Sequence, residues 1–147
     1  MSRILITGGT GCLGAVTVRD LLASDVERVI IATRSSDPGR LKLWLDEPLD
    51  ARIAFVSLDV GDKQAVQRAV TEHQPTHVIH LGALQSPDCD RNPELGMQIN
   101  VGGTQVLFET CEQLATPLKR FVFASSAAVY GPRAMYSGTV VKEDDAL

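Results

Sequence analysis

A glycine-rich segment directly behind a short apolar run is the feature that most constrains this chain. Gly8, Gly11 and Gly14 are spaced three residues apart and follow the strand-like run Ile4–Ile6. Glycine has no Cβ, so this spacing lets the backbone turn sharply, bring its N–H groups close to a phosphate, and pack the next helix on a sheet. The segment therefore predicts a strand, a tight turn, and a helix that begins at an anion-binding site.

The rest of the chain alternates short β-rich runs with longer helical patterns, which is typical of parallel βαβ units. The predicted strands are Arg3–Thr7, Arg28–Thr33, Ile53–Leu58, Thr76–Leu81 and Arg120–Ser125. The predicted helices are Leu13–Leu22, Arg40–Leu45, a helix capped by Asp62 that runs to His73, and the pattern from Pro93 to Leu114. Right-handed crossovers then predict an α/β, Rossmann-type doubly wound parallel sheet of about five strands in the order 3-2-1-4-5. Ala134–Leu147 is expected to be an irregular loop.

Size and composition indicate one globular domain. The 147 residues are 44% hydrophobic and 22% charged, which suffices for a buried core. The formal net charge of −4 argues against nucleic acid as the main partner, because phosphate binding usually requires a basic face. No segment has the length of a membrane span or a signal-peptide core, so we expect no membrane partner and a cytoplasmic location. Cys12, Cys89 and Cys111 lack metal-ligand spacing, which predicts reduced thiols and no metal site.

Candidate binding residues follow the predicted strands at their carboxyl ends, the edge where open parallel sheets bind ligands. Arg34 comes directly after the second strand. A carboxylate there would bind an adenosine ribose, whereas an arginine can hold a 2′-phosphate, so NADP is favoured over NAD. Two alternatives stay open: Arg34 could be a solvated loop residue, and Asp37 nearby could partly restore a preference for NAD. Asp59 and Val60 follow the third strand, where a carboxylate beside a backbone N–H can bind the adenine amine; Asp59 could instead cap the next helix.

The fourth and fifth strands end in two further groups. His80–Ala83 closes the fourth strand with small residues that permit close approach of a ligand. We interpret His80 as a packed strand-end histidine rather than a catalyst. Asn100, further along the sequence, belongs to the same candidate group. Its alternative role is structural, since its side chain could tie a helix to the fourth strand by hydrogen bonds. Ser125 and Ser126 end the fifth strand and would place hydroxyls over the nicotinamide position.

Together these motifs resemble the extended short-chain dehydrogenase/reductases of the NAD(P)-dependent epimerase/dehydratase family. Thr7–Gly14 resembles the family's T-G-x-x-G-x-x-G, and Asp59–Val60, His80–Ala83, Asn100–Thr104 and Ser125–Gly131 follow in the family's order. The resemblance implies hydride transfer between an NAD(P) cofactor and a small-molecule substrate, largely a nucleotide sugar. It implies the cofactor-binding residues Gly8, Gly11, Cys12, Leu13, Gly14, Asp59, Val60, Leu81, Gly82, Ala83 and Asn100, and the catalytic residue Ser126.

One feature of that family is missing from the sequence. The family uses a Tyr-x-x-x-Lys pair, whereas Tyr130 and Tyr136 are followed four residues later by Ala134 and Val140. We therefore expect residues 1–147 to be the NAD(P)-binding domain of a larger enzyme, truncated before that pair and the substrate lobe, and inactive alone. A non-catalytic dinucleotide-binding module or redox sensor, and an inactive self-associating piece, stay open as alternatives. The resemblance is also compatible with a homodimer.

Overall fold

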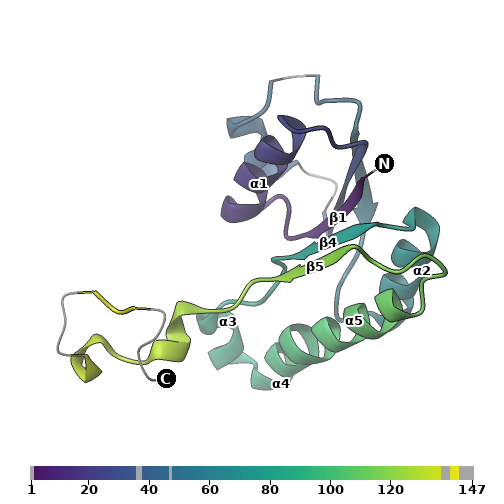
Figure 1. Ribbon diagram of the computed structural model, residues 1–147. Helices are drawn as coiled ribbons and strands as arrows, with labels where there is room; N and C mark the ends of the chain where they lie inside the picture. The colour runs from purple at the N-terminus through teal and green to yellow at the C-terminus, as the bar shows by residue number, and fades with distance from the viewer. Residues whose placement is uncertain (1, 36–37, 47, 137–139, 143–147) are drawn as a thin grey trace.

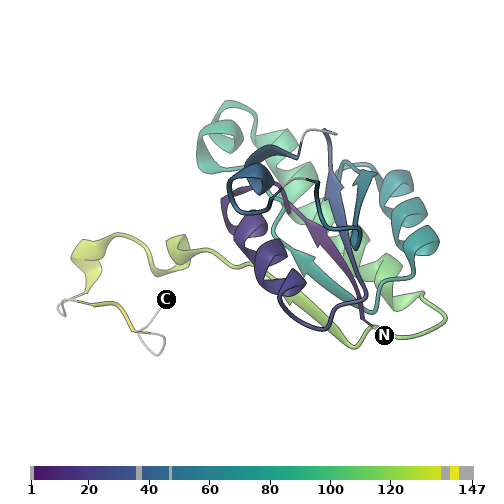
Figure 2. The ribbon, with the colours of Figure 1, turned by 90° about the horizontal axis from the view of Figure 1, so that it is seen from above.

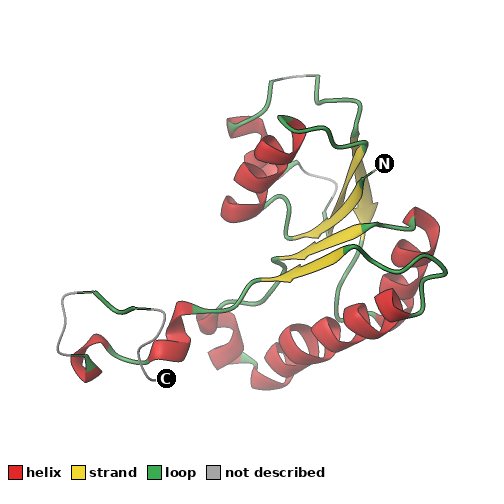
Figure 3. Cartoon of the chain, viewed as in Figure 1, coloured by secondary structure: helices red, strands yellow, loops and turns green. Residues whose placement is uncertain are grey.

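A five-stranded parallel sheet in the order β3-β2-β1-β4-β5 forms the centre of the computed structural model, which describes residues 2–35, 38–46, 48–136 and 140–142. The strands are β1 (Arg3–Thr7), β2 (Arg28–Thr33), β3 (Ile53–Ser57), β4 (His77–His80) and β5 (Arg120–Phe123). Helices cover both faces of the sheet (Figures 1 and 3). The predicted fold class and strand order are confirmed.

The helices divide between the two faces (Figures 1 and 2). One face carries α1 (Cys12–Leu22) and the 3₁₀-helix η1 (Gly39–Leu43). The other carries α2 (Lys63–His73) and α5 (Thr104–Glu112), which continues a helical stretch begun by α4 (Pro93–Gly96) and the π-helical η2 (Met97–Gly103). The remaining described helices are α3 (Ser86–Arg91), η3 (Ala127–Tyr130) and η4 (Arg133–Met135).

Each face of the sheet has its own apolar core, because alternate residues of a strand point to opposite sides. Ile6 and Ile31 pack with Val18 of α1, whereas Leu5 and Ile30 pack in the core on the α2 and α5 side. Burial on both faces explains why the second strand reads as the nearly continuous apolar run Arg-Val-Ile-Ile-Ala-Thr. The carboxyl ends of β1 and β2 are therefore held from two sides.

Helix ends follow the sequence signals closely. The Asp62 carboxylate accepts hydrogen bonds from the backbone N–H groups of Gln64 and Ala65 at 2.9 and 3.1 Å, which confirms it as the N-cap of α2. The short helix expected at Arg40–Leu45 forms as 3₁₀ over Gly39–Leu43.

The segment after β5 leaves the body of the molecule. Residues 124–136 project away from the sheet in both ribbon views (Figures 1 and 2). The loop expected at Ala134–Leu147 is irregular in its described part apart from the end of η4, while residues 137–139 and 143–147 lie outside the described residues.

Candidate dinucleotide-binding site

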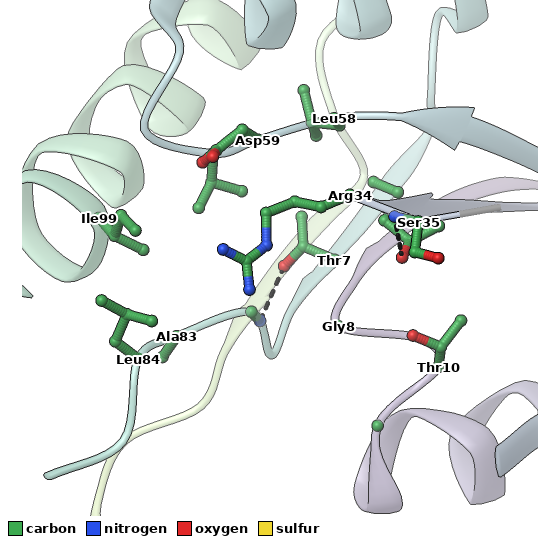
Figure 4. Close-up of a pocket in the computed structure, with 15 residues that line it drawn as sticks. Thr7, Gly8, Thr10, Arg34, Ser35, Leu58, Asp59, Ala83, Leu84 and Ile99 are labelled. Carbon is green, nitrogen blue, oxygen red and sulfur yellow. Dashed lines mark hydrogen bonds between the residues drawn. The ribbon is translucent and has the colours of Figure 1, made fainter. Parts of the chain in front are cut away.

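A cavity of about 330 Å³ opens at the carboxyl ends of β1 to β4 (Figure 4). It lies where the strand order reverses between β1 and β4, which is the usual ligand site of an open parallel sheet. Its volume falls within the range of small-molecule sites. The lining residues are Thr7, Gly8, Thr10, Gly11, Ala32, Thr33, Arg34, Ser35, Leu58, Asp59, Val60, Gly82, Ala83, Leu84 and Ile99.

The loop after β1 needs its glycines because backbone segments meet there. Gly8 has a φ of +71°, and a Cβ on it would lie 2.9 Å from the backbone nitrogen of Gly82. A Cβ on Gly14 would lie 2.1 Å from the carbonyl oxygen of Gly8. The loop is therefore pressed against both α1 and the connection after β4.

The N-terminus of α1 suits a phosphate group. Gly11 is the N-cap, and the first turn has no acidic residue. No side chain in the described part of the chain caps this turn with a hydrogen bond. The first N–H groups of a helix lack intrahelical partners, and the helix dipole adds positive potential there. Since Gly11 lines the cavity, these features fit the pyrophosphate of a dinucleotide.

Arg34 brings a positive charge to the same cavity. Its side chain extends from the end of β2 into the cavity (Figure 4). Among the residues that the structure describes, none forms a hydrogen bond or ion pair with its guanidinium. The position of the Arg34 side chain inside the cavity favours a binding role over that of a solvated loop residue.

Asp59 provides an acceptor from the end of β3. One carboxylate oxygen accepts a hydrogen bond from the N–H of Gly61 at 2.9 Å, and the residue lines the cavity beside Val60. The capping role that was its alternative belongs to Asp62. The orientation of the Asp59 carboxylate is therefore set by the turn that follows it.

The cavity brings together Gly8, Gly11, Arg34, Asp59, Val60, Gly82 and Ala83 of the predicted binding residues. Cys12 and Leu13 are exposed at the start of α1, and Gly14 packs behind the glycine loop. Leu81 packs against the core on the α1 side. None of these four lines the cavity, so their contact with a cofactor stays a prediction.

Asn100 and Ser126 also lie outside the cavity. The Asn100 side chain accepts a hydrogen bond from the N–H of Leu84 at 2.8 Å and donates one to its carbonyl at 3.0 Å, which is the structural tie considered as its alternative. The exposed Ser126 hydroxyl accepts from the N–H of Ala128 at 3.1 Å and caps η3. Its catalytic role stays a prediction.

Several lining residues were not predicted as binding residues from the sequence. Thr7 and Thr10 stand within the quoted glycine motif, and Thr33 flanks Arg34, so proximity to a motif was their signal. Leu84 directly follows Ala83 in the loop after β4, so it has the same signal. Ile99 has no comparable signal, because it reaches the cavity from the helical element η2.

His80 is packed inside the protein, as interpreted from the sequence. It is 2% exposed, and its two ring nitrogens lie near the hydroxyls of Thr7 and Thr104. Burial lowers the pKa of its imidazole, which favours the neutral ring.

Two absences hold for the described part of the chain. No helix there is long and apolar enough to cross a membrane. In the same residues, no three side chains of the metal-ligating types come together.

Comparison with known proteins gives a family match over residues 4–145, described as NAD dependent epimerase/dehydratase family. The chain is 31% identical over 137 residues to the dTDP-glucose 4,6-dehydratase of Shigella flexneri, covering 88% of this chain and 38% of that protein. It is 35% identical over 130 residues to the UDP-glucose 4-epimerase of Erwinia amylovora, covering 87% and 38%. The chain thus spans less than two fifths of the length of these relatives.

The fold has a close counterpart among solved structures. The UDP-glucose 4-epimerase of Thermus thermophilus, solved in complex with NAD, has 34% identity and a TM-score of 0.69, covering 84% of this chain and 37% of that one. The family match, the two relatives and the shared fold show that the chain belongs to the NAD-dependent epimerase/dehydratase family.

Proposed function

We propose that residues 1–147 are the NAD(P)-binding domain of an epimerase/dehydratase-type oxidoreductase that acts on a nucleotide sugar or a related hydroxyl or carbonyl substrate. The observation that carries the proposal is the cavity at the reversal of strand order, where the uncapped start of α1 meets Arg34 and Asp59. The relatives support the substrate class, since their names are those of dTDP-glucose and UDP-glucose enzymes. They do not favour the alternative of a non-catalytic module.

Each group then has a defined task. The N–H groups at the start of α1 bind the pyrophosphate, and the Asp59 carboxylate accepts a hydrogen bond from the adenine amine. Gly82 and Ala83 let the ribose and nicotinamide side approach the backbone. The dinucleotide supplies hydride transfer when bound. Ser126 positions the substrate oxygen, and a Tyr-x-x-x-Lys pair outside residues 1–147 supplies the acid and base.

Titration of the protein with NADH and with NADPH, measured by isothermal calorimetry, tests the proposal. Gly11→Val should abolish binding, because its side chain blocks the approach of the pyrophosphate to the backbone. Gly102→Val is the matched control, since a Cβ on Gly102 meets nothing closer than the Met97 carbonyl oxygen at 3.8 Å. Unchanged affinity of the Gly11 variant would remove the glycine loop from the site.

We further propose that the cofactor preference lies toward NADP. Arg34→Ala should weaken NADPH binding by about 1.5–3 kcal/mol through loss of a charge-assisted contact, and should weaken NADH binding much less. Arg68→Ala controls for the loss of a positive charge, because Arg68 is an exposed residue of α2 outside the cavity. Equal losses for the two dinucleotides would show that Arg34 does not read the 2′-phosphate.

The remaining parts of the proposal concern turnover, assembly and location. The purified chain should bind cofactor and convert no UDP-glucose; measurable turnover would overturn that expectation. A homodimer is supported by the exposed apolar side chains of Val122 and Phe123 on the edge strand β5. A monomer in light scattering at high concentration would exclude it. The proposed cytoplasmic location is tested by cell fractionation.

A further inference from the structure

A chain of hydrogen bonds runs behind the cavity from β1 through β4 to α5. The Thr7 hydroxyl lies 2.6 Å from Nδ1 of His80 and accepts a hydrogen bond from the N–H of Gly82 at 2.9 Å. On the other side of the ring, Nε2 of His80 lies 3.0 Å from the Thr104 hydroxyl. That hydroxyl donates to the carbonyl of Asn100 at 2.7 Å.

The direction of this chain follows from proton counting, because a threonine hydroxyl has one proton to donate. The Thr104 proton is given to the Asn100 carbonyl, so its oxygen can only accept from the ring. The proton of a neutral His80 must then sit on Nε2, and Nδ1 accepts the proton of the Thr7 hydroxyl. Every donor and acceptor in the chain is satisfied by this one tautomer.

The surroundings of the ring keep it neutral and fixed. His80 is 2% exposed, and the rings of Phe121 and Phe123 pack against it with centroids at 6.5 and 5.9 Å. Burial lowers the pKa of the imidazole, which opposes a second proton on the ring.

Both ends of the chain hold the loop after β4, which forms one wall of the cavity. Gly82 is held by the Thr7 hydroxyl, and Leu84 is held by the side chain of Asn100 at 2.8 and 3.0 Å. The opposite wall is close, since a Cβ on Gly8 would lie 2.9 Å from the Gly82 nitrogen. A small shift of this loop therefore changes the spacing between the two walls.

We propose that His80 is a positioning residue of the dinucleotide site. As the neutral ring protonated at Nε2, it fixes the direction of the Thr7 hydroxyl, which holds Gly82 at the distance from the glycine loop that the cofactor requires. The ring itself does not line the cavity. This inference rests on the proposed dinucleotide binding.

Thr104→Val tests the inference at a position outside the cavity. Valine keeps the shape of threonine but removes the acceptor for Nε2–H, so we expect NADH or NADPH to bind about tenfold more weakly, equivalent to about 1.4 kcal/mol. Thr104→Ser should restore affinity to within about threefold. Thr110→Val is the matched control. This buried α5 threonine also donates a hydrogen bond to the carbonyl four residues back, at 2.7 Å, but it takes no part in the hydrogen bonds that run from Thr7 through His80 to Asn100.

Nitrogen-15 NMR of the imidazole gives a second readout that does not depend on a variant folding. The wild-type His80 ring should be neutral and protonated at Nε2 near pH 7.5, and Thr104→Val should raise the fraction protonated at Nδ1. A wild-type ring protonated at Nδ1, or equal affinities of the two valine variants in a protein that binds dinucleotide, would overturn the inference alone. A wild-type protein that binds neither dinucleotide would overturn the proposed function, and the inference with it.

Discussion

Gly14→Ala makes the sharpest test of how the cofactor loop is built. Gly14 lies in the first turns of α1, where the helix crosses the loop after β1. An added Cβ would stand 2.1 Å from the Gly8 carbonyl oxygen and 2.6 Å from the Cα of Gly9, whereas ordinary contacts begin at 3.4 Å. The opposing atoms belong to the backbone and cannot rotate away, so α1 and the loop must separate by about 1 Å.

The expected cost is the difference of two terms. Overpacking of this kind costs about 1–3 kcal/mol, and the rigid backbone on both sides puts Gly14 at the upper end. Alanine in place of glycine within a helix returns up to about 1 kcal/mol. We therefore expect Gly14→Ala to lower the free energy of unfolding by about 2 kcal/mol. Because Gly8 lines the cavity, its displacement should lower dinucleotide affinity at least about tenfold.

Gly102→Ala is the control for the helical term. Gly102 also lies within a helical stretch, and its added Cβ would have the Met97 carbonyl oxygen at 3.8 Å as its nearest contact. The free energy of unfolding of Gly102→Ala should rise by about 0.5–1 kcal/mol, and its affinity for the dinucleotide should equal that of the wild type. Urea unfolding followed by circular dichroism, together with NADH titration, measures both quantities. Equal stability and equal affinity of the two alanine variants would refute the close-contact argument.

Three further predictions follow from single groups. Asp62→Ala should lower the free energy of unfolding by about 1 kcal/mol in urea titrations, because two N–H groups of α2 lose their acceptor, while Asp62→Asn should lose much less. Burial lowers the pKa of His80, so on acidification the unfolded chain binds a proton at this imidazole before the folded protein does. The contribution of His80 to the free energy of unfolding is therefore complete above about pH 6.5 and is lost as the pH falls below that value. Urea midpoints that rise on acidification across this range would contradict the prediction. Burial raises the pKa of Cys111 to about 11, so iodoacetamide near pH 8 should label the exposed Cys12 well before Cys111, as mass spectrometry of the peptides would establish.

The sheet could be predicted because its strands are buried on both faces. β1 and β2 have the bounds that the sequence indicated, since Ile4–Ile6 and Val29–Ala32 are apolar throughout and glycine or charged residues delimit them. The helix α3 was not predicted, because Ser86–Arg91 has no buried residue and therefore no apolar periodicity to detect.

The site was predictable where one motif lies on one connection and less so where distant segments meet. The glycine loop, Arg34 and Asp59 each follow a strand directly, so topology alone brings them to one edge. The hydrogen bonds between Asn100 and Leu84 join residues sixteen positions apart, so they depend on how the helical element that contains Asn100 packs against the loop after β4. Residue spacing does not encode that side-chain direction, which decides whether Asn100 faces a cofactor or the backbone.

The two halves of the predicted site also differ in what holds them. The cofactor half is fixed by buried strands and by cross-connections such as those from Thr7 to Gly82 and from Asn100 to Leu84. Ser126 follows an edge strand whose Phe123 is 52% exposed, and its hydroxyl accepts a hydrogen bond from the N–H of Ala128 within its own turn. Among the described residues, no hydrogen bond joins the Ser126 side chain to a residue that lines the cavity. We therefore expect the described contacts to preorganise the proposed dinucleotide site more strongly than they fix the position of Ser126.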